Sequence, residues 1–306
     1  IDYSPNETYM ATASQRSSLI IDKLAQAFKF STFHIDFKAA YLNAVPEEEL
    51  YMKTPVGMHK FFENDFRRIE RSGGTPALRL CKALYGLKQS AACWGKTLID
   101  YLKGCGFKQS RVDPCLLFKH HDNAELCSAL IVHGDDLKLI TTPTEYACFY
   151  KTLSSKFQTS GGPMKVFLGT FMKFGRDSNG QPVTQYTNRA YIDKILEDFG
   201  MSDCKPSHTP SAGVRLVKEL DEAKIDTEFP MRALVGDLLW LSKIRPDITY
   251  ATNMLARHSA SPGPCHVTAG KRILRYLKKT RDYAMVSKWD PEIGLELKLY
   301  ADADFA

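Results

Sequence analysis

The sequence predicts an α+β fold in which an antiparallel sheet is backed by helices and followed by a largely helical region. β-Prone apolar runs at 115–118, 126–132 and 137–141 follow one another through polar turns, as in an antiparallel meander. Apolar residues at helical spacing precede and flank these runs, and three further helical patterns cluster toward the end of the chain. Sheet and helix are therefore both expected, partly in separate regions.

Composition limits the classes of protein to consider. The 306 residues suggest about two compact units. Lys plus Arg number 41 against 35 Asp plus Glu, and this +6 balance leans mildly toward a polyanionic partner. The eight cysteines are scattered without a Cys-x-x-Cys pair and no secretory leader opens the sequence, so we expect reduced thiols in an intracellular protein. No apolar run approaches the roughly 20 residues that span a bilayer, so we expect a soluble protein without a membrane partner.

The first half of the chain reads as helix and strand in alternation. Residues 11–29 predict a helix that leads into a strand at 33–37, which carries Asp36 near its end. Short strands at 50–54 and 77–81 flank a connector with a Gly-rich turn. A helix at 83–101 precedes the meander, whose last bend contains Gly134, Asp135 and Asp136, and a helix at 143–158 follows it.

The second half begins with a hairpin formed by 166–174 and 182–186 and a helix at 189–200 that ends at a glycine. A Pro- and Ser-rich linker covers 205–213. The remaining predicted elements are helices at 231–244, 247–258 and 264–280 and strands at 283–288 and 294–300.

Three acidic side chains, remote in the sequence, are candidates for one metal site. Residues two apart in a strand share a face, so Asp36 is presented beside His34, away from the apolar side. Gly134 relaxes the backbone before Asp135 and Asp136, which lets consecutive carboxylates reach one site. Hard oxygen ligands of this kind suit magnesium and a phosphate-bearing substrate. The competing interpretation is a turn cap at position 36 and an ordinary acidic β-turn at 135–136.

Several blocks, in order, resemble the reverse transcriptase of copia-type retrotransposons. They are Asp36-Phe-Lys-Ala-Ala-Tyr41-Leu-Asn43, Tyr51-Met-Lys-Thr-Pro55, Leu84-Tyr85-Gly86-Leu87-Lys88-Gln89-Ser90, Asp113-Pro-Cys, Phe167-Leu168-Gly169, Arg245-Pro246-Asp247-Ile248 and Arg272-Ile-Leu-Arg-Tyr-Leu-Lys. Tyr300-Ala-Asp302-Ala-Asp304 resembles the opening strand of the ribonuclease H domain, in which Asp302 matches the first nuclease carboxylate.

The resemblance implies a right-hand polymerase palm in which Asp36, Asp135 and Asp136 bind two Mg²⁺ ions. It implies an RNA-directed DNA polymerase that uses an RNA template, a DNA primer and deoxynucleoside triphosphates, in a cytoplasmic virus-like particle. Tyr41 matches the position that packs against the incoming sugar, or else is a half-buried aromatic residue of the palm. Gln89 and Lys88 lie near the nucleotide by the same resemblance, or else form a solvated first turn of a helix.

The resemblance also implies a division of the chain: a palm at 1–160 with truncated fingers, a primer-grip and thumb-like region with its linker at 161–213, a connection-like helical region at 214–290, and a truncated start of ribonuclease H at 291–306. We expect no ribonuclease H activity, because Asp302 would lack its partner carboxylates. The oligomeric state is left open.

A basic stripe is predicted on the helix at 264–280. At about 100° per residue, five basic side chains fall on one side of it and apolar residues on another. They are Lys271, Arg272, Arg275, Lys278 and Lys279. Such a stripe is able to follow a phosphate backbone, although it is equally the usual solvated side of an amphipathic helix.

Departures from the family pattern leave two alternatives open. His133 and Gly134 stand where the family has Tyr and a bulky apolar residue, and Ala91 and Ala92 replace a Pro-Arg pair. One alternative is therefore a catalytically inactive retroelement remnant that binds nucleic acid. The other treats His34, Asp36, His133 and Asp135 as ligands of a transition-metal phosphoesterase, since imidazole suits zinc better than magnesium.

Overall fold

The computed structural model describes residues 8–296 and 298, apart from the side chain of Glu222. Backbone contacts divide the chain into two units. Unit 1 comprises the described residues up to Ile21 together with Phe30–Pro163, and unit 2 comprises Asp22–Lys29 together with the described residues from Met164 onward. The prediction of a mixed helix and sheet protein with antiparallel sheets is confirmed.

Unit 1 is built on a six-stranded antiparallel sheet with strand order β4-β5-β6-β7-β1-β8. Its strands are β1 (Ser31–Phe37), β4 (Lys108–Gln109), β5 (Leu116–His120), β6 (Leu126–His133), β7 (Asp136–Thr141) and β8 (Thr159–Pro163). The meander predicted from the sequence is therefore present, and β1 is inserted between β7 and β8.

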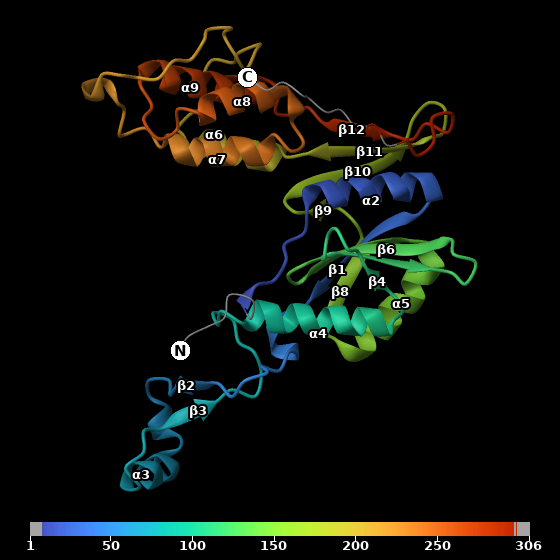
Figure 1. The fold of residues 1–306 in the computed structure, drawn as a ribbon, viewed down its shortest axis with the longest axis vertical. Helices are drawn as coiled ribbons and strands as arrows, with labels where there is room; N and C mark the ends of the chain where they lie inside the picture. The colour runs from blue at the N-terminus through green and yellow to red at the C-terminus, as the bar shows by residue number, and fades with distance from the viewer. Residues whose placement is uncertain (1–7, 297, 299–306) are drawn as a thin grey trace. The chain divides into compact units, whose positions relative to one another are not determined.

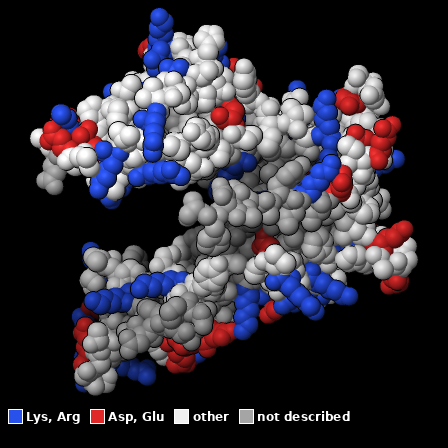
Figure 2. Space-filling view, turned by 45° about the horizontal axis from the view of Figure 1, so that its top comes forward, with Lys and Arg blue, Asp and Glu red and all other residues white. Residues whose placement is uncertain are grey.

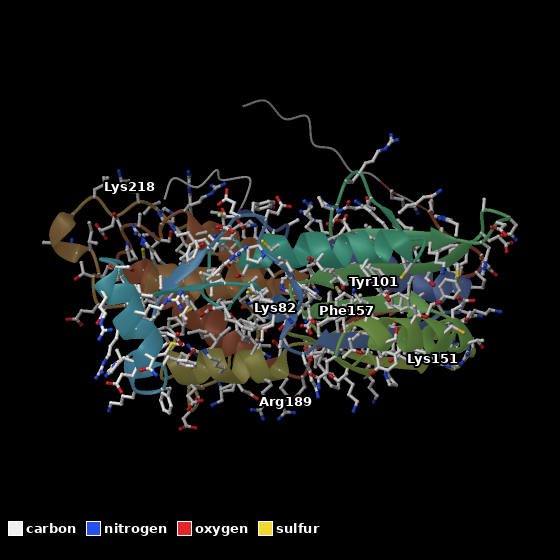
Figure 3. All side chains as sticks on the ribbon, turned by 90° about the horizontal axis from the view of Figure 1, so that it is seen from below. Lys82, Tyr101, Lys151, Phe157, Arg189 and Lys218 are labelled. Atoms are coloured by element: carbon white, nitrogen blue, oxygen red, sulfur yellow. The ribbon has the colours of Figure 1, made fainter. Side chains whose placement is uncertain are left out.

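Helices α4 (Ser90–Gly104) and α5 (Pro143–Lys156) supply the core of unit 1 together with one face of the sheet (Figure 1). Alternate residues of β1, namely Phe33, Ile35 and Phe37, are buried in this core, as the two-residue repeat of a strand requires. Phe157 packs edge-on against Tyr101 with ring centroids 5.1 Å apart, and the two side chains lie next to each other in Figure 3. This dense packing fixes the sheet that carries the candidate site.

The connector between β1 and α4 holds more structure than the sequence predicts. After a 3-10 turn η1 (Ala40–Asn43) come β2 (Tyr51–Lys53), η2 (Met58–Lys60), α3 (Glu63–Arg71) and β3 (Ala77–Arg79), with β2 paired to β3. The predicted helix at 83–101 begins only at Ser90. Helix α3 escapes prediction because it is only nine residues long and has two apolar side chains, Phe66 and Ile69, which is too short a pattern to establish a helical period.

Unit 2 combines a four-stranded antiparallel sheet, of order β12-β11-β10-β9, with a helical core. The strands are β9 (Val166–Phe167), β10 (Thr170–Arg176), β11 (Pro182–Thr187) and β12 (Met285–Lys288), and the helices are α6 (Arg189–Asp198), α7 (Met231–Leu241), α8 (Thr249–Ala256) and α9 (Pro264–Lys279), with 3-10 turns η3 (Glu222–Lys224) and η4 (Pro246–Ile248). Buried Leu, Ile and Val residues of the four helices form one cluster.

Helix α2 (Gln15–Phe28) contributes residues to both units. Its residues up to Ile21 belong to unit 1, and those from Asp22 onward belong to unit 2. Within unit 2, the hydroxyl of Tyr186 on β11 donates a 3.0 Å hydrogen bond to the Asp22 carboxylate, and burial raises the pKa of this phenol. Gln26 donates a bond of 3.0 Å to Thr184. In the part of the chain that the structure describes, no helix combines the length and apolar character needed to cross a bilayer.

Candidate active site

Asp36 and Asp136 are direct partners across β1 and β7. Residues paired in this way point to the same face of an antiparallel sheet. Since Phe33, Ile35 and Phe37 fill the core on the other face, both aspartates lie on the face opposite α4 and α5. Both are partly exposed. The structure thus brings together two acidic positions that lie 100 residues apart in the sequence.

Asp135 lies beside them in the two-residue turn that joins β6 to β7. Gly134 takes the first position of this turn with φ +61°, a positive value that glycine adopts without strain. The backbone N–H of Phe37 donates to the carbonyl oxygen of Asp135 at 3.0 Å, and the indole Nε1–H of Trp94 donates to the carbonyl oxygen of Gly134 at 2.9 Å. Because Trp94 is fully buried, the turn is held by the core.

Two polar side chains contact the aspartates directly. His34 Nε2 lies 2.8 Å from Asp136 Oδ1, with the two side chains 32% and 40% exposed. Ser160 Oγ on β8 donates a long bond of 3.5 Å to Asp36 Oδ2. Asp136 is thus engaged with an imidazole, and any ligand of its Oδ1 has to compete with that hydrogen bond.

Lys138 is a charged group of this sheet face that the sequence reasoning missed. It pairs with His34 across β1 and β7 and is completely buried. Its ammonium donates to the hydroxyl of Ser18 at 2.8 Å and to the carbonyl oxygen of Ser18 at 3.3 Å. The signal was available, because position 138 is two residues beyond Asp136 and therefore shares its face.

The donor chemistry of the three aspartates fits a hard divalent cation, and two of them share one sheet face with the third in the adjoining turn. Their side chains do not form a ready-made cluster: among the described residues, no group of three or more His, Cys, Asp or Glu side chains is arranged to hold a metal ion. The same finding applies to the alternative zinc set at 34, 36, 133 and 135. Binding of one ion by these side chains therefore requires side-chain rotation, and a ligand of Asp136 Oδ1 has to displace His34.

The three predicted nucleotide contacts occupy different surroundings. Tyr41 lies in η1, half-buried, with its ring centroid 4.5 Å from that of Tyr85. Lys88 is exposed, and Gln89 precedes the first turn of α4. Gln89 also lines a cavity of about 510 Å³ along α4. Neither Tyr41 nor the three aspartates line this cavity.

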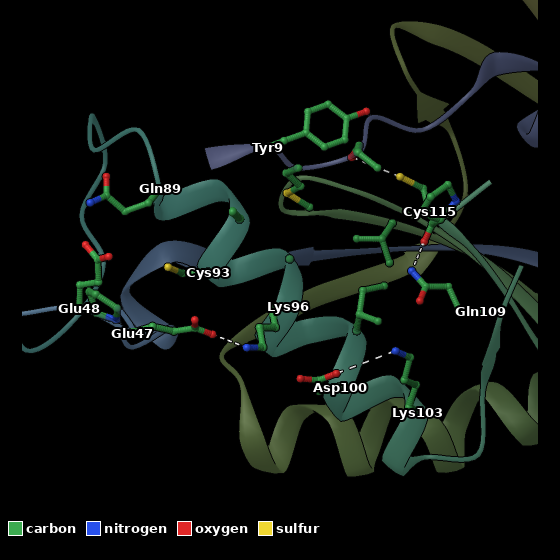
Figure 4. Close-up of a pocket in the computed structure, with 18 of the residues that line it drawn as sticks. Tyr9, Glu47, Glu48, Gln89, Cys93, Lys96, Asp100, Lys103, Gln109 and Cys115 are labelled. Carbon is green, nitrogen blue, oxygen red and sulfur yellow. Dashed lines mark hydrogen bonds and ion pairs between the residues drawn. The ribbon is translucent and has the colours of Figure 1, made fainter. Parts of the chain in front are cut away.

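The cavity has an apolar floor and a charged rim. Met10, Leu50, Ile99 and Val132 contribute apolar surface. At the rim, Lys96 contacts Glu47, and Lys103 Nζ lies 4.0 Å from Asp100 Oδ1 (Figure 4). Val132 belongs to the core cluster, so the cavity lies on the α4 face of the sheet, not on the face that carries Asp36 and Asp136.

The predicted basic stripe of α9 is present but is partly engaged by the linker that precedes α7. Arg272 donates to Thr209 Oγ1 at 2.8 Å and Arg275 donates to the carbonyl oxygen of Lys205 at 2.6 Å. Lys279 Nζ lies 3.0 Å from His208 Nε2. Lys271 and Lys279 are exposed, whereas Arg272, Arg275 and Lys278 are partly covered. On the face drawn in Figure 2, basic and acidic side chains are interspersed and neither forms one continuous field. Asp302 and Asp304 of the predicted ribonuclease H strand lie outside the described residues.

Comparison with known proteins identifies relatives of this chain. Residues 2–213 match the family model described as reverse transcriptase (RNA-dependent DNA polymerase). The chain is 29% identical, over 98% of its length, to the retrovirus-related Pol polyprotein from transposon TNT 1-94 of Nicotiana tabacum, and 30% identical, over its whole length, to that from transposon RE1 of Arabidopsis thaliana. It spans about a fifth of both polyproteins, 22% and 20%. It is also 27% identical, over 88% of its length, to a putative transposon Ty5-1 protein of Saccharomyces cerevisiae, of which it covers 82%.

Proposed function

Because the chain belongs to the reverse transcriptase (RNA-dependent DNA polymerase) family, we propose that it carries out RNA-directed DNA synthesis as part of a copia-type retrotransposon Pol polyprotein. The observation that carries the proposal is the direct pairing of Asp36 with Asp136. Like charges directly opposite each other destabilise a sheet. Their presence on a partly exposed face, next to the turn that carries Asp135, is accounted for if a cation neutralises them.

In this mechanism Asp36, Asp135 and Asp136 hold two Mg²⁺ ions. When bound, magnesium supplies the charge stabilisation that activates a primer 3′-hydroxyl and neutralises the triphosphate during in-line transfer. The protein's part is positioning. The hydrogen bonds from Trp94 and Phe37 anchor the turn that carries Asp135 next to β1. The hydrogen bond from His34 orients the carboxylate of Asp136 before an ion binds.

The remaining assignments follow the same proposal. Residues 1–160 form the palm, 161–213 the primer-grip and thumb-like region, and 214–290 the connection-like helical region. Tyr41 packs against the sugar of the incoming deoxynucleotide, with Gln89 and Lys88 close to that nucleotide. The stripe formed by Lys271, Arg272, Arg275, Lys278 and Lys279 follows the phosphate backbone of the RNA template and DNA primer, with the exposed Lys271 and Lys279 as its most accessible members.

Primer extension on a homopolymeric RNA template with a DNA primer tests this function. We expect magnesium-dependent incorporation by the unmodified chain and a loss of roughly 100-fold or more in Asp36→Asn and Asp135→Asn. Asp122→Asn is the matched control, because it removes the same charge from an exposed turn at the other end of the β6 strand. Incorporation that survives Asp135→Asn would refute the assignment. Template binding without any incorporation would favour the inactive remnant.

A further inference from the structure

The cavity along α4 is built entirely from residues of unit 1 and is separate from the aspartate site. Its walls come from residues 9–11, from the segment 46–50 that follows η1, and from one side of α4, with Val132 of β6 at its floor. Val132 belongs to the core on the α4 face of the sheet, whereas Asp36 and Asp136 lie on the opposite face. A volume of about 510 Å³ is typical of sites that take small organic molecules.

Contacts within the protein hold the cavity wall formed by residues 9–11 in place. Met10 packs so closely on α4 that a Cβ placed on Gly95 would lie 3.2 Å from its Cε atom. The Cys115 thiol donates a 3.2 Å hydrogen bond to the carbonyl oxygen of Ala11. Because the wall is positioned without a ligand, little of the binding free energy has to be spent on ordering the protein.

The interior of the cavity is uncharged. Burial raises the pKa of the Cys93 thiol, and it raises the pKa of Cys115 to about 11. Both thiols are therefore protonated at pH 7 and act as small apolar groups beside Leu50 and Ile99. The charged residues that line the cavity are all exposed, which places them at its rim. The part of a ligand that enters the cavity therefore has to be apolar.

The rim of the cavity carries a net charge of −1, since three carboxylates face two ammonium groups there. Lys96 contacts Glu47, and Lys103 Nζ lies 4.0 Å from Asp100 Oδ1. The remaining carboxylate, that of Glu48, makes no ion pair with any residue that the structure describes. Figure 4 shows Glu48 at the opposite end of the site from Lys103. The unpaired charge at the rim is therefore negative.

We propose that this cavity binds a small amphiphilic cation, whose apolar body lies against Leu50 and Ile99 and whose ammonium group contacts the Glu48 carboxylate. Charge complementarity selects a cation, because the interior is apolar and the one unpaired charge among the described rim residues is negative. The ring of Tyr9, which lines the same cavity and is 71% exposed, gains cover from the ligand and attracts ammonium groups through its face. The inference does not depend on the proposed function.

Three dansyl amides of matched size test this preference on the full chain. Dansylcadaverine carries a primary ammonium group, N-pentyl dansylamide is neutral, and dansyl-6-aminohexanoate carries a carboxylate. Their binding is followed by dansyl fluorescence at low salt, without magnesium, nucleic acid or nucleotides. We expect dansylcadaverine to bind with a dissociation constant on the order of 10 µM. Affinity should fall about threefold for the neutral probe and about threefold again for the anionic one, because an exposed ion pair contributes little.

Two variants with matched controls locate the site. In Glu48→Gln, dansylcadaverine should bind like the neutral probe, whose own affinity should not change, whereas Glu70→Gln on α3 should keep the preference because its exposed carboxylate lies outside the cavity. Ala92→Phe places a ring in the cavity and should weaken all three probes about tenfold or more. Ala147→Phe adds the same ring at an exposed position of α5 and should bind like the unmodified chain.

Equal affinity for the three probes, or a preference for the anionic one, would overturn the proposal. Binding to Ala92→Phe that matches binding to Ala147→Phe would also overturn it, since the probe would then lie outside the cavity. If Ala92→Phe does not fold, Glu48→Gln still decides the outcome, because its side chain is exposed and unpaired among the described residues. A cation preference that survives in Glu48→Gln would exclude the proposed contact.

Discussion

Asp36 and Asp136 face each other directly across two central strands, and each sits on a side of the sheet that the core does not use. Two carboxylates in this relation repel, and like charges directly opposite weaken a sheet by about 0.2–1 kcal/mol. The fold therefore retains this pair although the repulsion between the two carboxylates opposes it. The repulsion should be measurable in the free energy of unfolding as well as in activity.

Removing one of the two charges should stabilise the chain when no metal is added. We expect Asp36→Asn to raise the free energy of unfolding by about 0.5 kcal/mol in the presence of a chelator. Magnesium should then stabilise the unmodified chain, by about 2.7 kcal/mol at a hundredfold excess over its dissociation constant, and leave the variant nearly unchanged. Thermal unfolding with and without magnesium measures both effects. A variant that magnesium stabilises as strongly as the unmodified chain would contradict a role of Asp36 in holding the ion.

The Trp94 hydrogen bond to Gly134 should matter more for activity than its contribution to stability suggests. Trp94→Phe removes the Nε1–H donor and part of the ring, so we expect unfolding to become easier by about 2 kcal/mol. Because the turn then loses one of its two anchors, we expect the kcat of primer extension to fall about tenfold or more.

Leu98→Ala is the control for that variant. Leu98 is fully buried on the same helix, and its truncation should lower stability by about 2–5 kcal/mol while leaving the turn anchored. If Leu98→Ala loses as much kcat as Trp94→Phe, the effect of the tryptophan is one of general stability and not of turn position.

Gly134 should tolerate substitution according to backbone conformation alone. A Cβ placed there meets no atom within 4 Å, so the only penalty of Gly134→Ala comes from φ +61°. We expect Gly134→Ala to cost about 1 kcal/mol of stability, and Gly134→Asn to cost less because Asn adopts left-handed conformations more readily. Denaturant unfolding of the two variants tests the order. An alanine variant as stable as the asparagine variant would show that the turn relaxes to another geometry.

The sequence predicted the central strands of unit 1 because they are short apolar runs of β-prone residues separated by polar turns. The apolar runs that form β6 and β7 are joined by a turn at Gly134 and Asp135, which places Asp136 opposite His133. On the other side of β7, strand β1 places Asp36 opposite Asp136. The sequence did not predict β8, a Gly-rich edge strand ending in proline, since such residues are typical of loops and are tolerated only at an edge. Pairing between β1 and β8 depends on chain segments more than 120 residues apart.

For the candidate site, the sequence identified positions but not the contacts between side chains. Asp36, Asp135 and Asp136 were found from their residue types, whereas the His34 bond to Asp136 and the buried Lys138 depend on which groups face one another in three dimensions. The linker contacts of Arg272 and Arg275 were hidden for the same reason, because helical periodicity describes one helix and not what packs on it.

The Arg245–Asp247 pair should stabilise unit 2 over most of the pH range. Arg245 is 4% exposed in its side chain and donates to both carboxylate oxygens of Asp247, to which Tyr276 also donates at 2.8 Å. Burial alone would raise the pKa of Asp247, but the hydrogen bonds from Arg245 and Tyr276 outweigh it and the pKa is lowered. We expect Asp247→Asn to cost about 2 kcal/mol at pH 7, less than for a fully buried pair because the carboxylate is partly exposed.

The sign of the pH effect follows from the lowered pKa. The contribution of the pair is complete above the unfolded pKa of roughly 4 and is lost as the pH falls through the lower folded value. Unfolding of the two chains between pH 7 and pH 3 should therefore show a constant difference down to about pH 4 that shrinks below it. A difference that changes between pH 5 and pH 7 would be inconsistent with this carboxylate.

His266 should make unit 2 sensitive to a higher pH window. Its buried ring stacks on His258 with centroids 4.3 Å apart, and its Nδ1 accepts the Gly263 N–H at 2.8 Å at the start of α9. Burial, reinforced by His258, lowers the pKa of His266. Below the unfolded pKa of about 6.5, the unfolded chain therefore takes up a proton that the folded chain excludes, so stability falls as the pH drops, by at most about 1.4 kcal/mol per unit. His266→Gln keeps an acceptor for the helix start without this titration. Denaturant unfolding at pH 7.5, 6.5 and 5.5 should show a steeper loss for the unmodified chain than for the variant, and equal slopes would mean that His266 does not exclude the proton.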